Sequence, residues 1–138
     1  MKAVIQLIDY KLLNIEFINW EREQTEPGGL SFGHEITVLD SDHLSVEMDC
    51  SVGDEDGEDG VYIRVVLKGL FHIEHDLAQG FESETLQEIF ERNTLSILFP
   101  YLRSAISDIT LKANIDPVII PTVNINALLA SKEDDVSI

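Results

Sequence analysis

Basic residues and cysteines are scarce in this sequence, and no long apolar run is present. The 138 residues include 9 Lys and Arg against 26 Asp and Glu, which gives a formal net charge of −17 at pH 7. Proteins bind nucleic acid and anionic membrane surfaces through clustered Lys and Arg, so the composition excludes both classes of partner. The negative charge favours solubility and attracts basic partners.

Cys50 is the single cysteine, so no intrachain disulfide can form and the paired-cysteine motifs of zinc sites are absent. Near the N-terminus, Gln6 and Asp9 interrupt the apolar stretch, which is atypical of a secretory signal. No run approaches the roughly 20 apolar residues that a membrane-spanning helix needs. We therefore expect a cytoplasmic protein that does not insert into a membrane.

The motifs that mark common active sites and metal sites are missing as well. The sequence has no GxSxG, no Gly-rich phosphate loop and no HExxH. Counted from Asp54, the acidic loop 53–60 has Asp59 where an EF-hand requires glycine, so a solvated hairpin turn is the better interpretation. His72 and His75 diverge on a predicted strand, and no cysteine pair supplies two more zinc ligands. We expect no metal, no cofactor and no enzyme, although an acid–base pair formed in space stays open as an alternative.

Apolar residues are nevertheless abundant for so charged a chain. They make up 44% of the sequence, and the mean hydropathy is +0.04. A chain of this length has room for one core, so we expect the surplus apolar surface to form a subunit interface or a binding groove.

Four segments alternate between apolar and polar residues, as strands of a half-buried sheet do. They are residues 3–18, 32–39, 43–52 and 61–74. In the first segment, strict alternation places Tyr10 and Leu12 on the face opposite Ile5. Asp9 and Lys11 interrupt the face of Ile5, which indicates a bulge or an exposed middle. In the third segment Cys50 faces inward, where a thiol is buried and inert. The segments follow one another across turns, so we predict a meander of four antiparallel strands.

A long helix follows these strands. Thr85 and Glu88 fit a capping box. One apolar stripe then recurs at helical spacing, through Leu95, Leu98, Leu102, Ile106 and Ile109. A second stripe of Ile97, Tyr101 and Ala105 lies beside it, so we expect the sheet to cover one side of the helix and a second subunit the other. Pro100 should kink the helix or divide it into two pieces.

An extended stretch and a short final helix are predicted after this helix. Pro117 and Pro121 hold 118–120 extended, and Asn124 caps a short final helix over 124–130. Residues 131–138 are predicted to be a disordered polar tail. The fold class is therefore α+β, with one domain over 1–130 that has a four-stranded antiparallel sheet, a long C-terminal helix and a short final helix.

Two blocks near the C-terminus carry a family resemblance. ILFPYLRSAIS at 97–107 and PTVNINALL at 121–129 resemble the signature region of the SecB export chaperones. The matching positions are Leu98, Phe99, Pro100, Tyr101, Arg103, Val123, Asn124, Ala127 and Leu128. Residues 5–17 and 61–71, which include Gly69, Leu70 and Phe71, are similar to the family's first and fourth strands.

The resemblance implies a four-stranded antiparallel sheet with helices on one side, assembled as a homo-oligomeric dimer of dimers. It implies a chaperone that holds unfolded or precursor proteins in apolar grooves without ATP and delivers them to the export motor SecA. Two alternatives stay open. One is a SecB-like chaperone dedicated to a single client such as an antitoxin, and the other, more distant, is an enzyme of unknown activity.

The resemblance also implies where partners bind. The client groove lies between the sheet and the short final helix, and its matching residues are Ile36, Val38, Ile125, Leu128 and Leu129. Phe32 and Trp20 extend the groove in this interpretation, and the alternative is that both pack on the edge of the core.

SecA docks on acidic residues of the sheet's flat outer face in the family. Glu16 keeps one acidic position, Leu12 and Arg64 replace two others, and Tyr62 stands where leucine is usual. These departures predict weak, salt-sensitive SecA binding or none.

Overall fold

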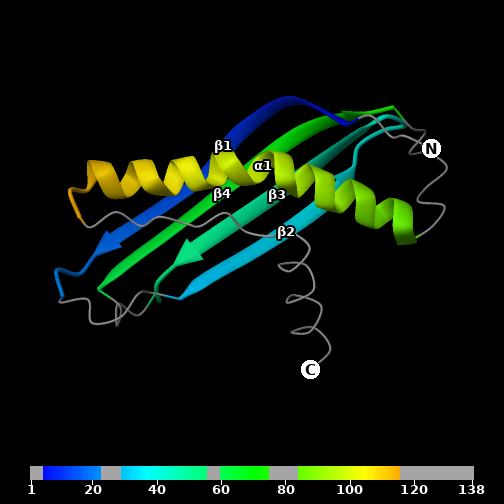
Figure 1. Cartoon of the computed structure of the whole chain (residues 1–138). Helices are drawn as coiled ribbons and strands as arrows, with labels where there is room; N and C mark the ends of the chain where they lie inside the picture. The colour runs from blue at the N-terminus through cyan, green and yellow to red at the C-terminus, as the bar shows by residue number, and fades with distance from the viewer. Residues whose placement is uncertain (1–4, 23–28, 56–59, 75–83, 116–138) are drawn as a thin grey trace.

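The computed structural model describes residues 5–22, 29–55, 60–74 and 84–115. They form one sheet and one long helix, whose elements are β1 (Ile5–Asn19), β2 (Leu30–Val38), β3 (His43–Val52), β4 (Val61–Ile73) and α1 (Glu84–Lys112). The helix lies across one face of the sheet (Figure 1). This arrangement confirms the α+β class, the four antiparallel strands and the long helix. The expected final helix and polar tail lie outside the described residues.

The order of the strands differs from the predicted meander. The sheet runs β1-β4-β3-β2, and every neighbouring pair is antiparallel. A meander would pair β1 with β2, whereas here these two strands form opposite edges of the sheet. The sequence of β4, VYIRVVLKGLFHI, is apolar at positions that point to both faces, and such a strand is most stable in the interior of a sheet. Pairing with both β1 and β3 gives β4 such an interior position.

Two bulges in β1 decide which of its residues face the helix. The register with β4 shifts between Leu7 and Asp9 and again between Leu12 and Asn14. Each bulge adds one residue to the strand, so the side chains after it change face. As a result one face carries the apolar row Ile5, Leu7, Tyr10, Leu12, Ile15 and Phe17. The expected bulge is confirmed, but the assignment of Tyr10 and Leu12 to the face opposite Ile5 was wrong.

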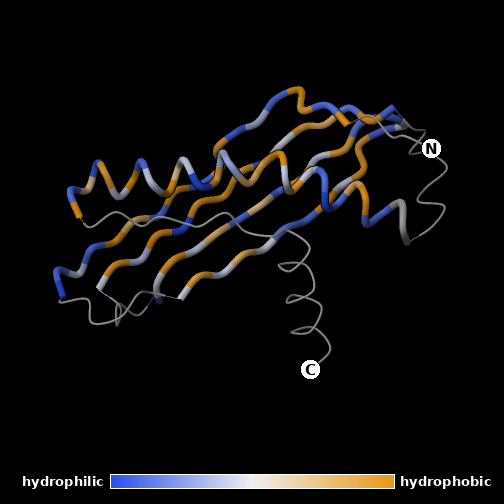
Figure 2. The backbone as a smooth tube through the Cα atoms, viewed as in Figure 1, coloured by the Kyte–Doolittle hydropathy of each residue, from blue (hydrophilic) through white to orange (hydrophobic). Residues whose placement is uncertain are grey.

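The core lies between the sheet and α1. Figure 2 shows apolar and polar residues alternating along the strands. The inward residues of β3 are Leu44, Val46, Met48, Cys50 and Val52, as the alternation predicts, and all are buried. They meet a single stripe of the helix, of which Leu98, Leu102 and Ile106 are fully buried. Gly69 of β4 lies directly beneath the helix, because a Cβ atom there would be 2.8 Å from a methyl group of Leu98.

The helix is one continuous element from Glu84 to Lys112, with Pro100 inside it. Thr85 is already helical, so it does not take the N-cap position that a capping box requires. Pro100 has no backbone N–H, so the carbonyl of Ser96 lacks its usual helical hydrogen-bond donor. Both residues are exposed. Water can satisfy that carbonyl, so the helix continues, and Figure 1 shows its axis bending near the middle. No helix in the described ranges is long and apolar enough to cross a membrane.

Candidate functional site

The helix-facing side of β2 carries a row of five residues, which we call the β2 strip. It consists of Leu30, Phe32, His34, Ile36 and Val38, whose partners in β3 are all inward-facing residues. Phe32 and Ile36 are half-buried against the core. Leu30 is 42% exposed and Val38 is 44% exposed, so the two ends of the strip offer apolar surface to solvent.

Contacts with α1 cover only the middle of the strip. The ring of Phe32 lies 5.8 Å from the ring of Phe99, measured between centroids. His34 is hydrogen-bonded to Glu91 on the N-terminal half of the helix. The structure therefore brings together Phe32, Ile36 and Val38, as the sequence predicted, while Ile125, Leu128 and Leu129 lie outside the described residues.

Trp20 does not lie near this strip. Its backbone N–H donates a 2.9 Å hydrogen bond to the carbonyl of Gly60, which places Trp20 beyond the end of β1. β1 and β2 are opposite edges of the sheet, so two strands separate Trp20 from the strip. Trp20 is half-buried at this position.

A second exposed apolar surface lies beside the C-terminal half of α1. We call it the β1 flank, and it consists of Tyr10, Leu12, Ile15 and Tyr101, each between 40% and 47% exposed. The rings of Tyr10 and Tyr101 are 4.4 Å apart between centroids, so strand and helix share this surface. Sequence reasoning missed this surface. The apolar residues on this face of β1 are separated alternately by two and three residues along the chain, and strict alternation requires a separation of two. The separations of three occur at the two bulges, whose positions the sequence does not show.

The second apolar stripe of the helix points toward this flank rather than away from the sheet. Ile97 and Ala105 pack against the core and are half-buried. The side of α1 that points away from the sheet exposes mainly polar residues, among them Asn93, Ser96 and Ser104. Within the described ranges, the exposed apolar surface beside the second stripe therefore lies at the β1 flank.

The outer face of the sheet, opposite the helix, carries the predicted docking residues except Leu12. Glu16 lies opposite Arg64, and Ile18 lies opposite Tyr62. Leu12 lies opposite the buried residue Leu67, so it points to the helix side and belongs to the β1 flank. The bulge at Leu13 separates it from the face of Glu16.

Charges on this outer face are divided between its two halves. In one row across the sheet, Lys11 of β1 and Lys68 of β4 stand next to Glu47 of β3 and Glu35 of β2. Arg64 lies 3.9 Å from Asp49, between Nη2 and Oδ2. The β1–β4 half is therefore partly basic, and an acidic docking surface is not continuous there.

Tyr62 offers little of its ring to a partner. It is only 4% exposed although it points to the outer face, because neighbouring side chains cover it. Its hydroxyl lies 3.4 Å from Glu55 and donates to it. This burial raises the pKa of Tyr62, and the nearby carboxylates of Glu55 and Glu16 raise it further.

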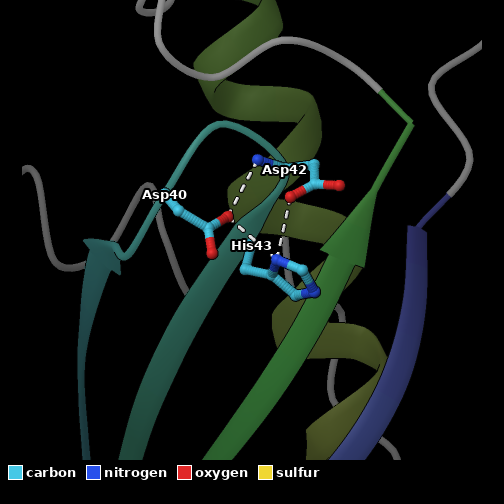
Figure 3. A group of neighbouring side chains, drawn as sticks. All are labelled: Asp40, Asp42 and His43. Atoms are coloured by element: carbon cyan, nitrogen blue, oxygen red, sulfur yellow. Dashed lines mark hydrogen bonds and ion pairs between the residues drawn. The ribbon is translucent and has the colours of Figure 1, made fainter.

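A group of histidines and aspartates lies at one end of the outer face. Figure 3 shows three of its members, Asp40, Asp42 and His43, in and after the β2–β3 turn. His72 of β4 lies opposite His43 in the register, and the two rings are 5.2 Å apart. We call these four residues the turn cluster. Sequence reasoning tested His72 only with His75 and missed this pairing, which follows from the register of the β3–β4 hairpin.

Hydrogen bonds within the turn cluster shift two of its pKa values. The backbone N–H of Asp42 donates to Asp40, and with His43 nearby this lowers the pKa of Asp40 to about 2. The side-chain hydrogen bond between His43 and Asp40 raises the pKa of His43. Cys50, by contrast, is fully buried, which raises its pKa to about 12 and makes it inert as a nucleophile.

Comparison with protein families gives one match, which covers most of the chain. Residues 13–135 match the family described as preprotein translocase subunit SecB. An uncharacterized protein of Methanocaldococcus jannaschii, MJ0357, is 36% identical over 74 residues, which are 54% of this chain and 44% of that protein. The protein-export protein SecB of Saccharophagus degradans is 29% identical over 102 residues, 72% of this chain and 58% of that protein. The matches therefore span about half the length of these relatives.

Two solved structures share the fold. The SecB-like chaperone Rv1957 of Mycobacterium tuberculosis, in complex with a ChAD peptide from the antitoxin HigA1, matches with a TM-score of 0.67 and 18% identity. The match covers 87% of this chain and 88% of that one. A Streptococcus agalactiae protein of unknown function matches with a TM-score of 0.52 and 14% identity, over 88% of this chain and all of that one.

Proposed function

The chain belongs to the SecB family, and we propose that it is a molecular chaperone that holds unfolded polypeptides without ATP. The observation that carries this proposal is the β2 strip, an apolar row on an edge strand whose ends are left open by α1. Aliphatic side chains recognise apolar segments with little shape specificity, as a chaperone with many clients requires. We place the chaperone in the cytoplasm, as a single domain over 1–130.

The strip would hold a client through several weak contacts. Burial of one exposed aliphatic side chain contributes about 1 to 2 kcal/mol. A long client that contacts Leu30, Val38 and residues beyond them gains affinity by effective concentration, because the first contact makes the next intramolecular. Ile125, Leu128 and Leu129, which match the family's final helix, would complete the groove, whereas the position of Trp20 argues against a share in it.

Assembly follows from the β1 flank. Tyr10, Leu12, Ile15 and Tyr101 form a contiguous apolar surface on and beside β1, an edge strand of the described sheet, and such surfaces are typical of subunit interfaces. We propose that a second copy of the chain covers this flank and that the oligomer is a dimer of dimers.

Two functions are candidates for the chaperone: export of many precursors, or protection of one dedicated client. The family suggests precursor export through SecA, and Glu16 fits such a contact. A dedicated client, such as an antitoxin, is the second candidate. It is favoured by Lys11, Lys68 and Arg64 on the outer face, which weaken an acidic docking surface, and it fits the antitoxin peptide bound to Rv1957.

A light-scattering assay with a denatured precursor tests the holding activity. We expect the chain to suppress aggregation near stoichiometric ratios without ATP, and added ATP should change nothing. Aggregation that proceeds as in buffer, at an excess of folded chain, would refute the proposal.

A further inference from the structure

The turn cluster consists of two aspartates and two histidines, which are common metal ligands, and their side chains lie close together. We propose that Asp40, Asp42, His43 and His72 bind a divalent cation of the zinc class. The Nδ1 atom of His43 lies 2.8 Å from an Oδ1 of Asp40 and 2.9 Å from Oδ1 of Asp42. The other carboxylate oxygen of Asp42 lies 3.2 Å from Nε2 of His72. Asp42 therefore stands between the two imidazoles (Figure 3 shows its contact with His43).

These separations resemble those within a zinc coordination shell. Zinc binds His nitrogen and carboxylate oxygen at about 2.0 to 2.2 Å, so neighbouring ligand atoms of a tetrahedral site are about 3.3 Å apart. The ligand atoms of Asp40, Asp42 and His43 all lie within 4.8 Å of one another. These three donors thus need only small adjustments to surround one ion, and His72, whose Nε2 atom faces the other carboxylate oxygen of Asp42, must move closer to complete the set.

Two carboxylate oxygens face the Nδ1 atom of His43 at nearly the same distance. In the metal-free protein one N–H can be shared between both oxygens. A cation bound to the deprotonated nitrogen would contact the same two carboxylates.

The backbone holds these side chains in place. The N–H of Leu39 donates to the carbonyl of His43 at 3.0 Å, which closes the β2–β3 turn. The N–H of Ile73 donates to the carbonyl of Asp42 at 2.8 Å, which ties the turn to β4 next to His72. The donors are therefore positioned by the sheet, and preorganisation of this kind raises affinity for an ion.

The donor set selects the kind of ion. Calcium takes six to eight oxygen ligands and magnesium prefers octahedral oxygen, whereas this cluster offers two imidazoles and two carboxylates. Imidazole favours zinc and its neighbours in the first transition series. The four side chains are between 31% and 58% exposed, so an ion can enter from solvent. Once bound, it would fasten the β2–β3 turn to β4.

Calorimetric titration of the metal-stripped full-length chain with zinc chloride tests the site. We expect one high-affinity zinc per chain. His72→Gln should weaken zinc binding by about tenfold or more, since even loss of a residue that only supports a ligand costs about 10- to 100-fold. His34→Gln, which removes a histidine on the other face, should leave the affinity unchanged.

A second pair of variants separates coordination from attraction to the acidic surface. Asp42→Asn and Asp9→Asn remove the same charge, and only Asp42→Asn should weaken zinc. Bound cobalt should show the intense visible absorption of a tetrahedral site and lose it in His72→Gln, while circular dichroism reports that each variant is folded. Equal zinc affinity in wild type and folded His72→Gln, or calcium that competes as well as zinc, would overturn the proposal.

Discussion

At the residue scale, Gly69 sets how closely the helix approaches the sheet. A Cβ atom at this position would lie 2.8 Å from Leu98 and 2.9 Å from Phe71, both fully buried. Tyr10 lies opposite Gly69 in the neighbouring strand. A larger residue here would push α1 away from its stripe of core contacts.

We expect Gly69→Ala to lower the free energy of unfolding by about 1 to 3 kcal/mol, because overpacking forces buried side chains out of their preferred rotamers. Urea denaturation followed by circular dichroism measures this change. Gly29→Ala is the matched control, since nothing lies within 4 Å of a Cβ atom there. An equal effect of the two substitutions would show that Gly69 does not limit the packing.

The pKa of His43 is a second prediction at this scale. Its folded pKa is raised mainly by Asp40, so this contact stabilises the fold below the usual histidine pKa and is lost as pH rises through the folded value. In Asp40→Asn, the pKa of His43 should move down toward its ordinary value. Proton NMR of the metal-free protein, with a chelator present, follows the ring signals. An unchanged titration midpoint would mean that Asp40 does not interact with His43 in solution.

At the element scale, prediction from the sequence worked where local pattern decides the structure. β3 spans 43–52 as predicted, because clean alternation lies between two turns. The faces of β1 were partly misassigned, because a bulge changes the face of later residues without a clear local signal. The pairing of β1 with β4 depends on contacts between residues far apart in sequence, and alternation carries no information on which strands are neighbours.

The same reasoning applies to the candidate sites. Phe32, Ile36 and Val38 share a face because they are spaced by even numbers along one strand, which the sequence shows. Trp20 and Leu12 could be placed only with the strand order and the bulges known.

The β1 flank gives a prediction about assembly. Leu12→Glu should dissociate the oligomer, because an unpaired charge buried in an apolar interface costs several kcal/mol, roughly enough to lower the association constant a hundredfold or more. Light scattering with size-exclusion chromatography measures the mass. Leu13→Glu is the control, since Leu13 is equally exposed but lies at the bulge, outside the flank. A wild-type chain that is already a 15.5 kDa monomer would contradict the proposed assembly.

At the scale of the whole molecule, the two faces of the sheet differ in the surface that they present to partners. We propose that the apolar surface on the helix side binds clients and a second subunit. The outer side carries divided charges, with Lys11, Lys68 and Arg64 in its β1–β4 half. A strongly acidic chain can therefore still present a poor surface for a basic partner, since recognition depends on local charge.

We expect SecA to bind weakly, with an affinity that falls steeply with salt, or not at all. Arg64→Glu should strengthen binding, because it restores an acidic residue beside Glu16. Lys112→Glu makes the same change of charge on the helix and should have little effect. Binding isotherms at low and high salt decide the matter, and tight binding of the wild type that survives high salt would place the docking surface elsewhere.

The central claim is that the β2 strip holds unfolded chains. The most direct measurement compares suppression of aggregation by the double variant Leu30→Ser, Val38→Ser with that by Leu111→Ser. Leu111 is 76% exposed on the helix, so the control also removes exposed apolar surface, away from the strip. The double variant should need at least about 30-fold more chaperone for half-suppression, because the loss of two contacts of about 1 to 2 kcal/mol each weakens binding by about 2 to 4 kcal/mol. Its melting temperature and oligomer mass should match those of the control. Full suppression by a folded double variant would contradict the claim.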